Sequence, residues 1–157
     1  MVWEDAAGRN AGSRLRAFAP PPRHTQANDL SEATLASGPG LPGAARAALF
    51  DWLAGSAPAG LVSDAQLLVS ELATNSFLHA EHATGEPVRL RAGSFDRSIW
   101  VEVADAGRDG AVTRRAPLPD GSGGFGLHLV DHLASDWGVT HVDGTEVWFV
   151  LAHPARA

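Results

Sequence analysis

The sequence of 157 residues contains no cysteine and no lysine, and these two absences exclude several kinds of site. Without cysteine the chain cannot form a disulfide, a thiolate zinc site or a cysteine nucleophile. Without lysine it cannot form a P-loop, in which a lysine contacts the β- and γ-phosphates of the nucleotide. A nucleotide site in this chain would therefore have to be of another kind.

Positive charge is also scarce. Twelve arginines stand against 18 acidic residues, giving a net charge of -6, which disfavours non-specific binding to nucleic acid or to an anionic membrane. No apolar run approaches the ~20 residues that a membrane helix needs, and residues 1–12 lack the apolar core of a signal peptide. We expect a cytoplasmic protein that binds neither nucleic acid nor membranes directly.

The length suits one domain, and the first part of the chain differs from the rest. Residues 1–28 show no sustained hydrophobic period and contain Pro20-Pro21-Pro22, which is typical of a flexible N-terminal extension. Residues 29–157 have the pattern of a single folded domain. We therefore place the domain boundary at residue 29.

Within that domain the hydrophobic pattern predicts helices and strands that alternate along the chain. Gly55 should end the first helix, and Ser63 should be the N-cap of the second. The expected elements are a strand at 31–37, helices at 42–54, 63–80 and 125–135, and strands at 88–95, 99–105, 137–142 and 146–151. The two hairpins, 88–105 and 137–151, predict an α+β, two-layer sandwich with helices on one face of a mixed, largely antiparallel sheet.

A carboxylate and an amide lie four residues apart on the second expected helix. Positions four apart share a helix face, so Glu71 and Asn75 should project together. Both offer hard oxygen atoms suited to Mg²⁺, and the carboxylate could take a proton from a hydroxyl. Alone, this spacing is more typical of a solvated helix face.

Asp105 ends an expected strand and is followed by Ala106-Gly107. A carboxylate at a strand end can accept a hydrogen bond from an exocyclic amine such as that of adenine. The same three residues also suit an ordinary turn, so this segment alone does not identify a site.

A glycine-rich segment, 121–126, runs directly into the third expected helix. Glycines let the backbone approach phosphate oxygens, and a helix N-terminus presents unpaired N–H groups and the positive end of the helix dipole. A flexible hinge would have the same composition.

The order of these motifs resembles that of the GHKL ATPase superfamily, and more narrowly that of the anti-sigma-factor serine/threonine kinases, which have a histidine-kinase-like ATPase domain. Residues 68–80 resemble the N-box of that family, 101–107 its first glycine box, 123–127 its second glycine box and 143–149 its closing strand motif. The resemblance covers about residues 30–152 and implies the GHKL, or Bergerat, ATP-binding fold.

The resemblance also implies a role for individual residues. Glu71 would be the catalytic residue that polarises the attacking serine hydroxyl, and Asn75 would bind the Mg²⁺ carried by ATP. Asp105 would bind the adenine amino group, with Gly107 beside it and Thr145 as the hydroxyl of the closing motif. The remaining cofactor-binding positions would line the phosphates, under a lid formed by 108–122: Gly123, Gly124, Phe125, Gly126 and Leu127.

In function the resemblance implies an anti-sigma factor that regulates transcription by binding a sigma factor, an antagonist protein, or both. With ATP and Mg²⁺ it would phosphorylate a serine of the antagonist. The alternative is a non-catalytic ATP-binding, or nucleotide-free, protein-interaction module. Asp109 replaces the second glycine of the first glycine box and favours this alternative, whereas Glu71 favours the kinase. A homodimer is left open in both cases.

Overall fold

A computed structural model describes residues 30–79, 86–95, 98–105, 126–140 and 144–153. These residues form five strands and three helices. In chain order the elements are β1 (Ser31–Leu35), α2 (Leu41–Leu53), α3 (Ala59–His79), β2 (Val88–Phe95), β3 (Ser98–Asp105), α4 (Gly126–Leu133), β4 (Asp136–Thr140) and β5 (Thr145–Ala152). The expected extension, 1–28, and the boundary at residue 29 lie outside the described residues.

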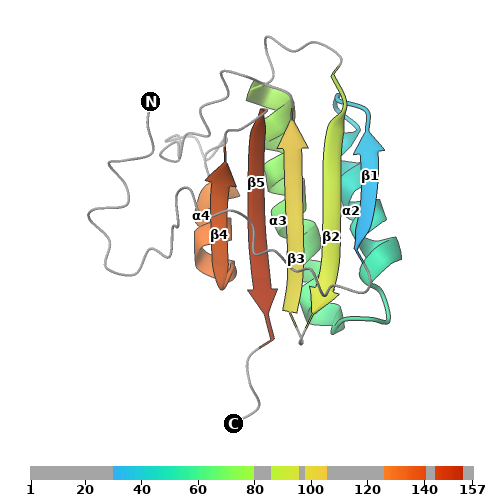
Figure 1. Cartoon of the computed structure of the whole chain (residues 1–157), viewed down its shortest axis with the longest axis vertical. Helices are drawn as coiled ribbons and strands as arrows, with labels where there is room; N and C mark the ends of the chain where they lie inside the picture. Colours follow the sequence, from blue (N-terminus) through green and yellow to red (C-terminus); the bar gives the residue numbers. More distant parts are fainter. Residues whose placement is uncertain (1–29, 80–85, 96–97, 106–125, 141–143, 154–157) are drawn as a thin grey trace, which may run out of the picture.

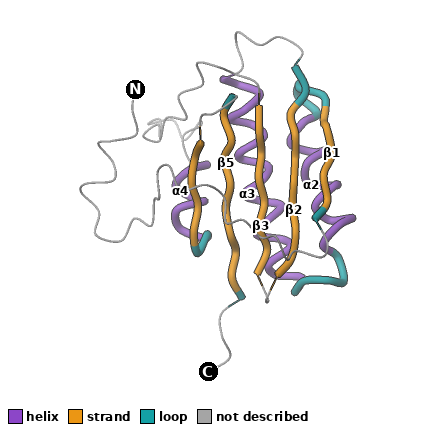
Figure 2. The backbone as a smooth tube through the Cα atoms, viewed as in Figure 1, coloured by secondary structure: helices purple, strands orange, loops and turns teal. Residues whose placement is uncertain are grey.

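The strands form one sheet in the order β1-β2-β3-β5-β4, and every described pairing is antiparallel. All three described helices lie on the same face of this sheet, behind it in Figure 1. The hairpins β2–β3 and β4–β5 meet through β3 and β5, the central pair of long strands in Figure 2. The predicted α+β two-layer fold is confirmed.

The first described helix, α2, follows the predicted pattern closely. Its buried residues recur every four positions, at Leu41, Ala45, Leu49 and Leu53, which gives the helix one continuous apolar stripe. The chain leaves the helix through Gly55, whose φ of 84° lies in the left-handed region that glycine adopts without strain. Gly55 therefore ends α2 as predicted.

The start of α3 was predicted wrongly. The helix begins at Ala59, four residues before Ser63, and the Val62 N–H donates to the Pro58 carbonyl at 3.1 Å. Proline immediately before a helix fixes the backbone at a helical φ and has no N–H of its own to satisfy. Ser63 is consequently an exposed residue inside the helix and not its N-cap.

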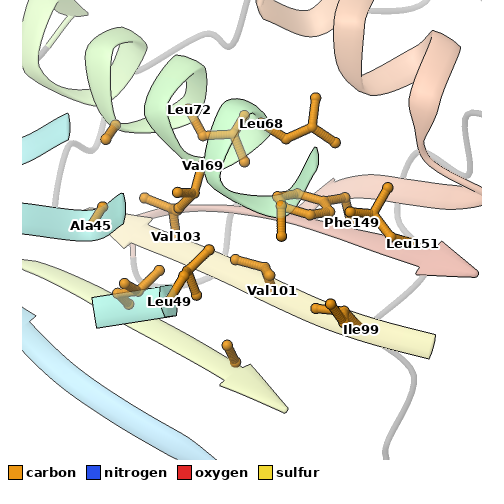
Figure 3. Packing of buried hydrophobic residues seen from close by; sticks show 14 of the residues in the cluster. Ala45, Leu49, Leu68, Val69, Leu72, Ile99, Val101, Val103, Phe149 and Leu151 are labelled. Atoms are coloured by element: carbon orange, nitrogen blue, oxygen red, sulfur yellow. The ribbon is translucent and has the colours of Figure 1, made fainter. Parts of the chain in front are cut away.

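The core lies between the helix layer and the sheet. Figure 3 shows side chains of α3 packed against the strands, and Leu68, Val101 and Phe149 are fully buried there. Each large apolar side chain removed from water contributes about 1.5–3 kcal/mol. This packing fixes the inner face of α3 against β3 and β5.

Alternation along the strands sends the other side chains to the outer face, away from the helices. Trp100, Trp148 and Val150 form a separate apolar cluster there. The Arg91 guanidinium lies 5.4 Å from the centre of the Trp100 ring and donates to Glu102 at 3.3 Å. Within the described ranges, no helix is long and apolar enough to span a lipid bilayer.

Candidate functional site

The buried face of α3 ends in a polar residue. Val69, Leu72 and Ala73 lie on that face, and the next position in the helical pattern is Ser76, which is only 8 % exposed. A hydroxyl in this position costs free energy unless it forms a hydrogen bond. Ser76 must therefore have a partner in the sheet layer.

That partner is Asp105. Asp105 is the last residue of β3 and follows Val101 and Val103 on the inner side of the strand. The Ser76 hydroxyl donates to Asp105 Oδ2 at 2.9 Å. The hydrogen bond joins two residues 29 positions apart and holds the carboxylate in a defined orientation at the end of the strand.

Thr145 lies beside Asp105 on the neighbouring strand. It is the first residue of β5, it pairs with Asp105 in the β3–β5 register, and it is 3 % exposed. The end of β3, the start of β5 and the last turns of α3 thus bring a carboxylate and two hydroxyls together. A carboxylate accepts hydrogen bonds, whereas hydroxyls both donate and accept, so the group can recognise a ligand that has both donors and acceptors.

Glu71 and Asn75 lie on the same helix as Ser76, and both are half-buried. They are one turn apart and differ by about 40° around the helix axis. Thr74, between them, turns its hydroxyl back to the Ser70 carbonyl at 2.8 Å. The polar edge of α3 next to the Ser76–Asp105 pair is therefore formed by Glu71 and Asn75.

The helix that follows the glycine-rich segment begins at Gly126, one residue later than predicted, and packs against α3. It ends near β5, where the Ser135 N–H donates to the Val150 carbonyl, and β4 then runs towards the Thr145 end of β5. Such a short connection reverses the chain, so Gly126 and Leu127 lie at the end of α4 nearer the Asp105–Thr145 pair. The positive end of the helix dipole is directed towards that end of the domain.

The remaining predicted site residues, Gly107, Gly123, Gly124 and Phe125, lie outside the described residues, as does the predicted lid, 108–122. The structure thus brings together Asp105 and Thr145 directly, with Glu71 and Asn75 on the adjoining helix. The sequence analysis missed Ser76. Its position on the apolar stripe of α3, directly after Asn75, was the signal that it needed a partner.

The candidate site thus lies at one end of a two-layer α+β sandwich, where the edge of α3 meets the end of β3 and the start of β5. The model of the family described as the histidine kinase-like ATPase domain matches residues 35–151. The chain therefore belongs to the histidine kinase-like ATPase domain family. An ATPase domain binds ATP, so this is an ATP-binding protein. No curated protein sequence matches the chain.

Among solved structures, the chain is similar to the RsbU and RsbW domains of Rv1364c from Mycobacterium tuberculosis. The TM-score is 0.58 at 22 % sequence identity, and the match covers 78 % of this chain and 31 % of that one. The chain thus spans about a third of that protein's length. At this identity the similarity supports the shared fold.

Proposed function

We propose that this chain is an ATP-dependent protein kinase of the anti-sigma-factor type, which phosphorylates a serine of an antagonist protein. The observation that carries the proposal is the Asp105 carboxylate, oriented by Ser76 at the end of β3 beside Thr145. It supplies the hydrogen-bond acceptor that an adenine amino group requires, in a family defined by its ATPase domain.

In this proposal Asp105 and Thr145 recognise the base. Because Ser76 holds Oδ2, the plane of the carboxylate is set before the nucleotide arrives, and little side-chain entropy is lost on binding. Gly107 allows the backbone to pass close to the ring. The start of α4, with Gly126 and Leu127, and the preceding Gly123, Gly124 and Phe125 bind the phosphates.

The residues on α3 fit a magnesium ion that is carried by the nucleotide. Magnesium takes few ligands from the protein and the others from phosphates and water, and Asn75 offers one amide oxygen from a half-buried position. When bound, Mg²⁺ would neutralise charge on the phosphates.

Glu71 takes the proton from the serine hydroxyl of the protein substrate. The serine oxygen then forms its bond to the γ-phosphorus as the bond to the leaving ADP breaks.

The protein partners follow from the resemblance to anti-sigma kinases and from the RsbW domain named in the similar structure. We assign the ATP-binding domain to residues 29–157, and we place the protein in the cytoplasm with a sigma factor and its antagonist as partners. A second candidate is a module that binds ATP, or no nucleotide, without phosphoryl transfer; Asp109 in the first glycine box favours it.

Calorimetric titration of the protein with Mg-ATP tests the base site. We expect Asp105→Asn to weaken binding, because the amide presents an N–H₂ group to the adenine amine in one of its two orientations. Asp136→Asn is the matched control, since Asp136 is a half-buried aspartate at the start of β4, at the opposite end of the sheet. Equal affinities for all three proteins would remove Asp105 from the base site.

Transfer of labelled phosphate from ATP to a candidate antagonist tests the chemistry. Glu71→Ala should abolish transfer and leave Mg-ATP affinity close to that of the natural chain, because Glu71 acts on the attacking hydroxyl. Transfer that survives this substitution would refute the assignment of Glu71. ATP binding by the natural chain without transfer to any antagonist would favour the non-catalytic module.

A further inference from the structure

The outer face of the sheet is buried, although every described helix lies on the other face (Figure 1). On it, Trp148 is 1 % exposed, Trp100 is 5 % exposed and Glu102 is 1 % exposed. Tryptophans on the open face of a single sheet normally keep part of their rings in water. The described helices do not account for this burial, so a further layer must cover the face.

Two glycines explain how the tryptophans lie. Trp100 is opposite Gly93 on β2, and Trp148 is opposite Gly138 on β4. A Cβ added at Gly138 would meet Trp148 Cζ2 at 2.8 Å, so the indole lies directly on the glycine backbone. β4 therefore covers one side of the Trp148 ring, and the other side faces the layer that covers the sheet.

Polar atoms on the same face indicate the chemistry of that layer. Four buried donors and one buried acceptor have no hydrogen-bond partner within the described part of the chain: the Nε1 atoms of Trp100 and Trp148, the Nε atoms of Arg89 and Arg91, and Oε2 of Glu102. An indole N–H only donates and a carboxylate only accepts, and a buried polar group left unpaired costs about 1–3 kcal/mol. The covering layer should therefore bring mainly carbonyl oxygens, to the indoles and the arginine Nε atoms, and one donor to Glu102.

The place where the chain enters the sheet indicates which segment this is. Ser31, the first residue of β1, pairs with Ala92, and the next residue, Gly93, pairs with Trp100. The chain therefore enters β1 at the end of the sheet where Trp100 lies. From β1 to β4 the sheet is four strand spacings wide, about 19 Å at ~4.8 Å each. About six extended residues cross that width, and 29 residues precede Leu30.

The other segments outside the described residues are less suited. Residues 106–125 join Asp105 to α4, and Asp105 is at the end of β3 opposite to the one beside which the chain enters β1. The segments 96–97, 141–143 and 154–157 have fewer residues than the crossing needs. Residues 80–85 are just six, and they must also connect α3 to β2.

The composition of residues 1–29 matches the face. Pro20-Pro21-Pro22 favours a polyproline II helix, which docks on aromatic surfaces at little entropic cost and presents carbonyl oxygens. Arg23 follows directly and provides a charged donor. Burial raises the pKa of Glu102 although Arg91 and Arg89 lie near it, as expected for a dry site that would gain from a further donor.

We propose that residues 1–29 fold back over the outer face of the sheet in the same chain, with Pro20-Pro21-Pro22 lying across Trp100 and Trp148 and Arg23 facing Glu102. The domain then has three layers: helices, sheet and a proline-containing strap. Because this surface is opposite the nucleotide site, the proposal does not depend on the function proposed above.

The absence of cysteine provides a direct test. A nitroxide label on Ala19→Cys in the full-length, ¹⁵N-labelled protein should abolish the indole N–H signals of Trp100 and Trp148. A label on Ala47→Cys, an exposed position of α2, is the matched control and should weaken the signal of Trp52 instead. With the label reduced, the Trp137 indole signal reports an intact fold, because its N–H donates to Asp131 at 3.1 Å on the helix side.

A mixed sample distinguishes the same chain from a second copy. In this sample one protein carries the nitroxide but no ¹⁵N, and the other carries ¹⁵N but no nitroxide. Both indole signals should then persist. Loss of the signals in this mixture would show that a second copy covers the face and would overturn the proposal. Persistence of the signals when label and isotope share one chain would overturn it as well.

Replacing Pro20, Pro21 and Pro22 by glycine in the Ala19→Cys protein tests the proline contact. The two indole signals should return, since a glycine segment loses far more conformational entropy on docking. If the signals remain lost in this variant, the proline segment is not what holds the strap.

Discussion

Replacing Ser76 by alanine tests the oriented carboxylate at the centre of the site. The substitution removes one oxygen and with it the 2.9 Å hydrogen bond to Asp105 Oδ2. A hydrogen bond to a charged group contributes about 1.5–3 kcal/mol. Asp105 is half-buried, so water can replace part of the bond, and we expect a loss near the lower end, about 1.5 kcal/mol of unfolding free energy.

Nucleotide binding should be weakened for a different reason, the cost of ordering the carboxylate. In the natural chain the carboxylate is fixed before ATP arrives, whereas in Ser76→Ala it must be ordered on binding. Ordering one side chain costs about 0.5–1.5 kcal/mol, so ATP affinity should fall about two- to tenfold. Calorimetric titration measures the affinity, and urea unfolding monitored by circular dichroism measures the stability.

Thr74→Ala is the control for this experiment. It removes a hydroxyl from the same helix, two residues away, but one that donates to the Ser70 carbonyl and not to Asp105. ATP affinity should be unchanged in this variant. If Ser76→Ala also binds ATP as tightly as the natural chain, the proposed orienting role of Ser76 is refuted.

Two further predictions concern the outer face. Gly138→Ala should destabilise the fold by about 1–3 kcal/mol in urea unfolding, because the new methyl would overlap the Trp148 ring. Gly60→Ala on α3 is the control: a Cβ added there meets no atom within 4 Å and the φ is not positive, so this variant should be more stable by about 0.4–1 kcal/mol. For Glu102, burial raises the pKa above its usual 4.5, Arg91 lowers it, Glu146 raises it and Arg89 lowers it, with a net rise. The native state then holds the proton more tightly than the unfolded chain does, so ionisation of Glu102 lowers stability as the pH rises above 4.5. The stability of Glu102→Gln relative to the natural chain should therefore increase between about pH 4 and about pH 7, and parallel unfolding profiles would contradict this.

Local patterns were enough to predict most elements of the fold. The hairpins 88–105 and 137–151 could be recognised because alternation and turn residues act over short distances. The start of α3 was missed because Ser63, followed by Asp64, resembles an N-cap, whereas Pro58 is an equally local signal and directly precedes the helix.

The site was harder to predict than the fold. Alternation places Asp105 and Thr145 on the inner face, but their pairing depends on the register between β3 and β5, which are separated by α4 and β4. Ser76 was missed because the local pattern does not show which residue of the sheet a hydroxyl on the buried face of α3 will contact, and only the fold brings it to Asp105.

The position of β5 has a consequence for how the domain forms during synthesis. β5 is the last described strand in the chain, yet it lies between β3 and β4 in the sheet. Until β5 has been made, β4 has no strand to pair with, one edge of β3 is unpaired, and Asp105 has no Thr145 beside it. Nascent chains that stop before Thr145 should consequently lack the strand that joins β4 to the rest of the sheet and the residue that completes the candidate site beside Asp105.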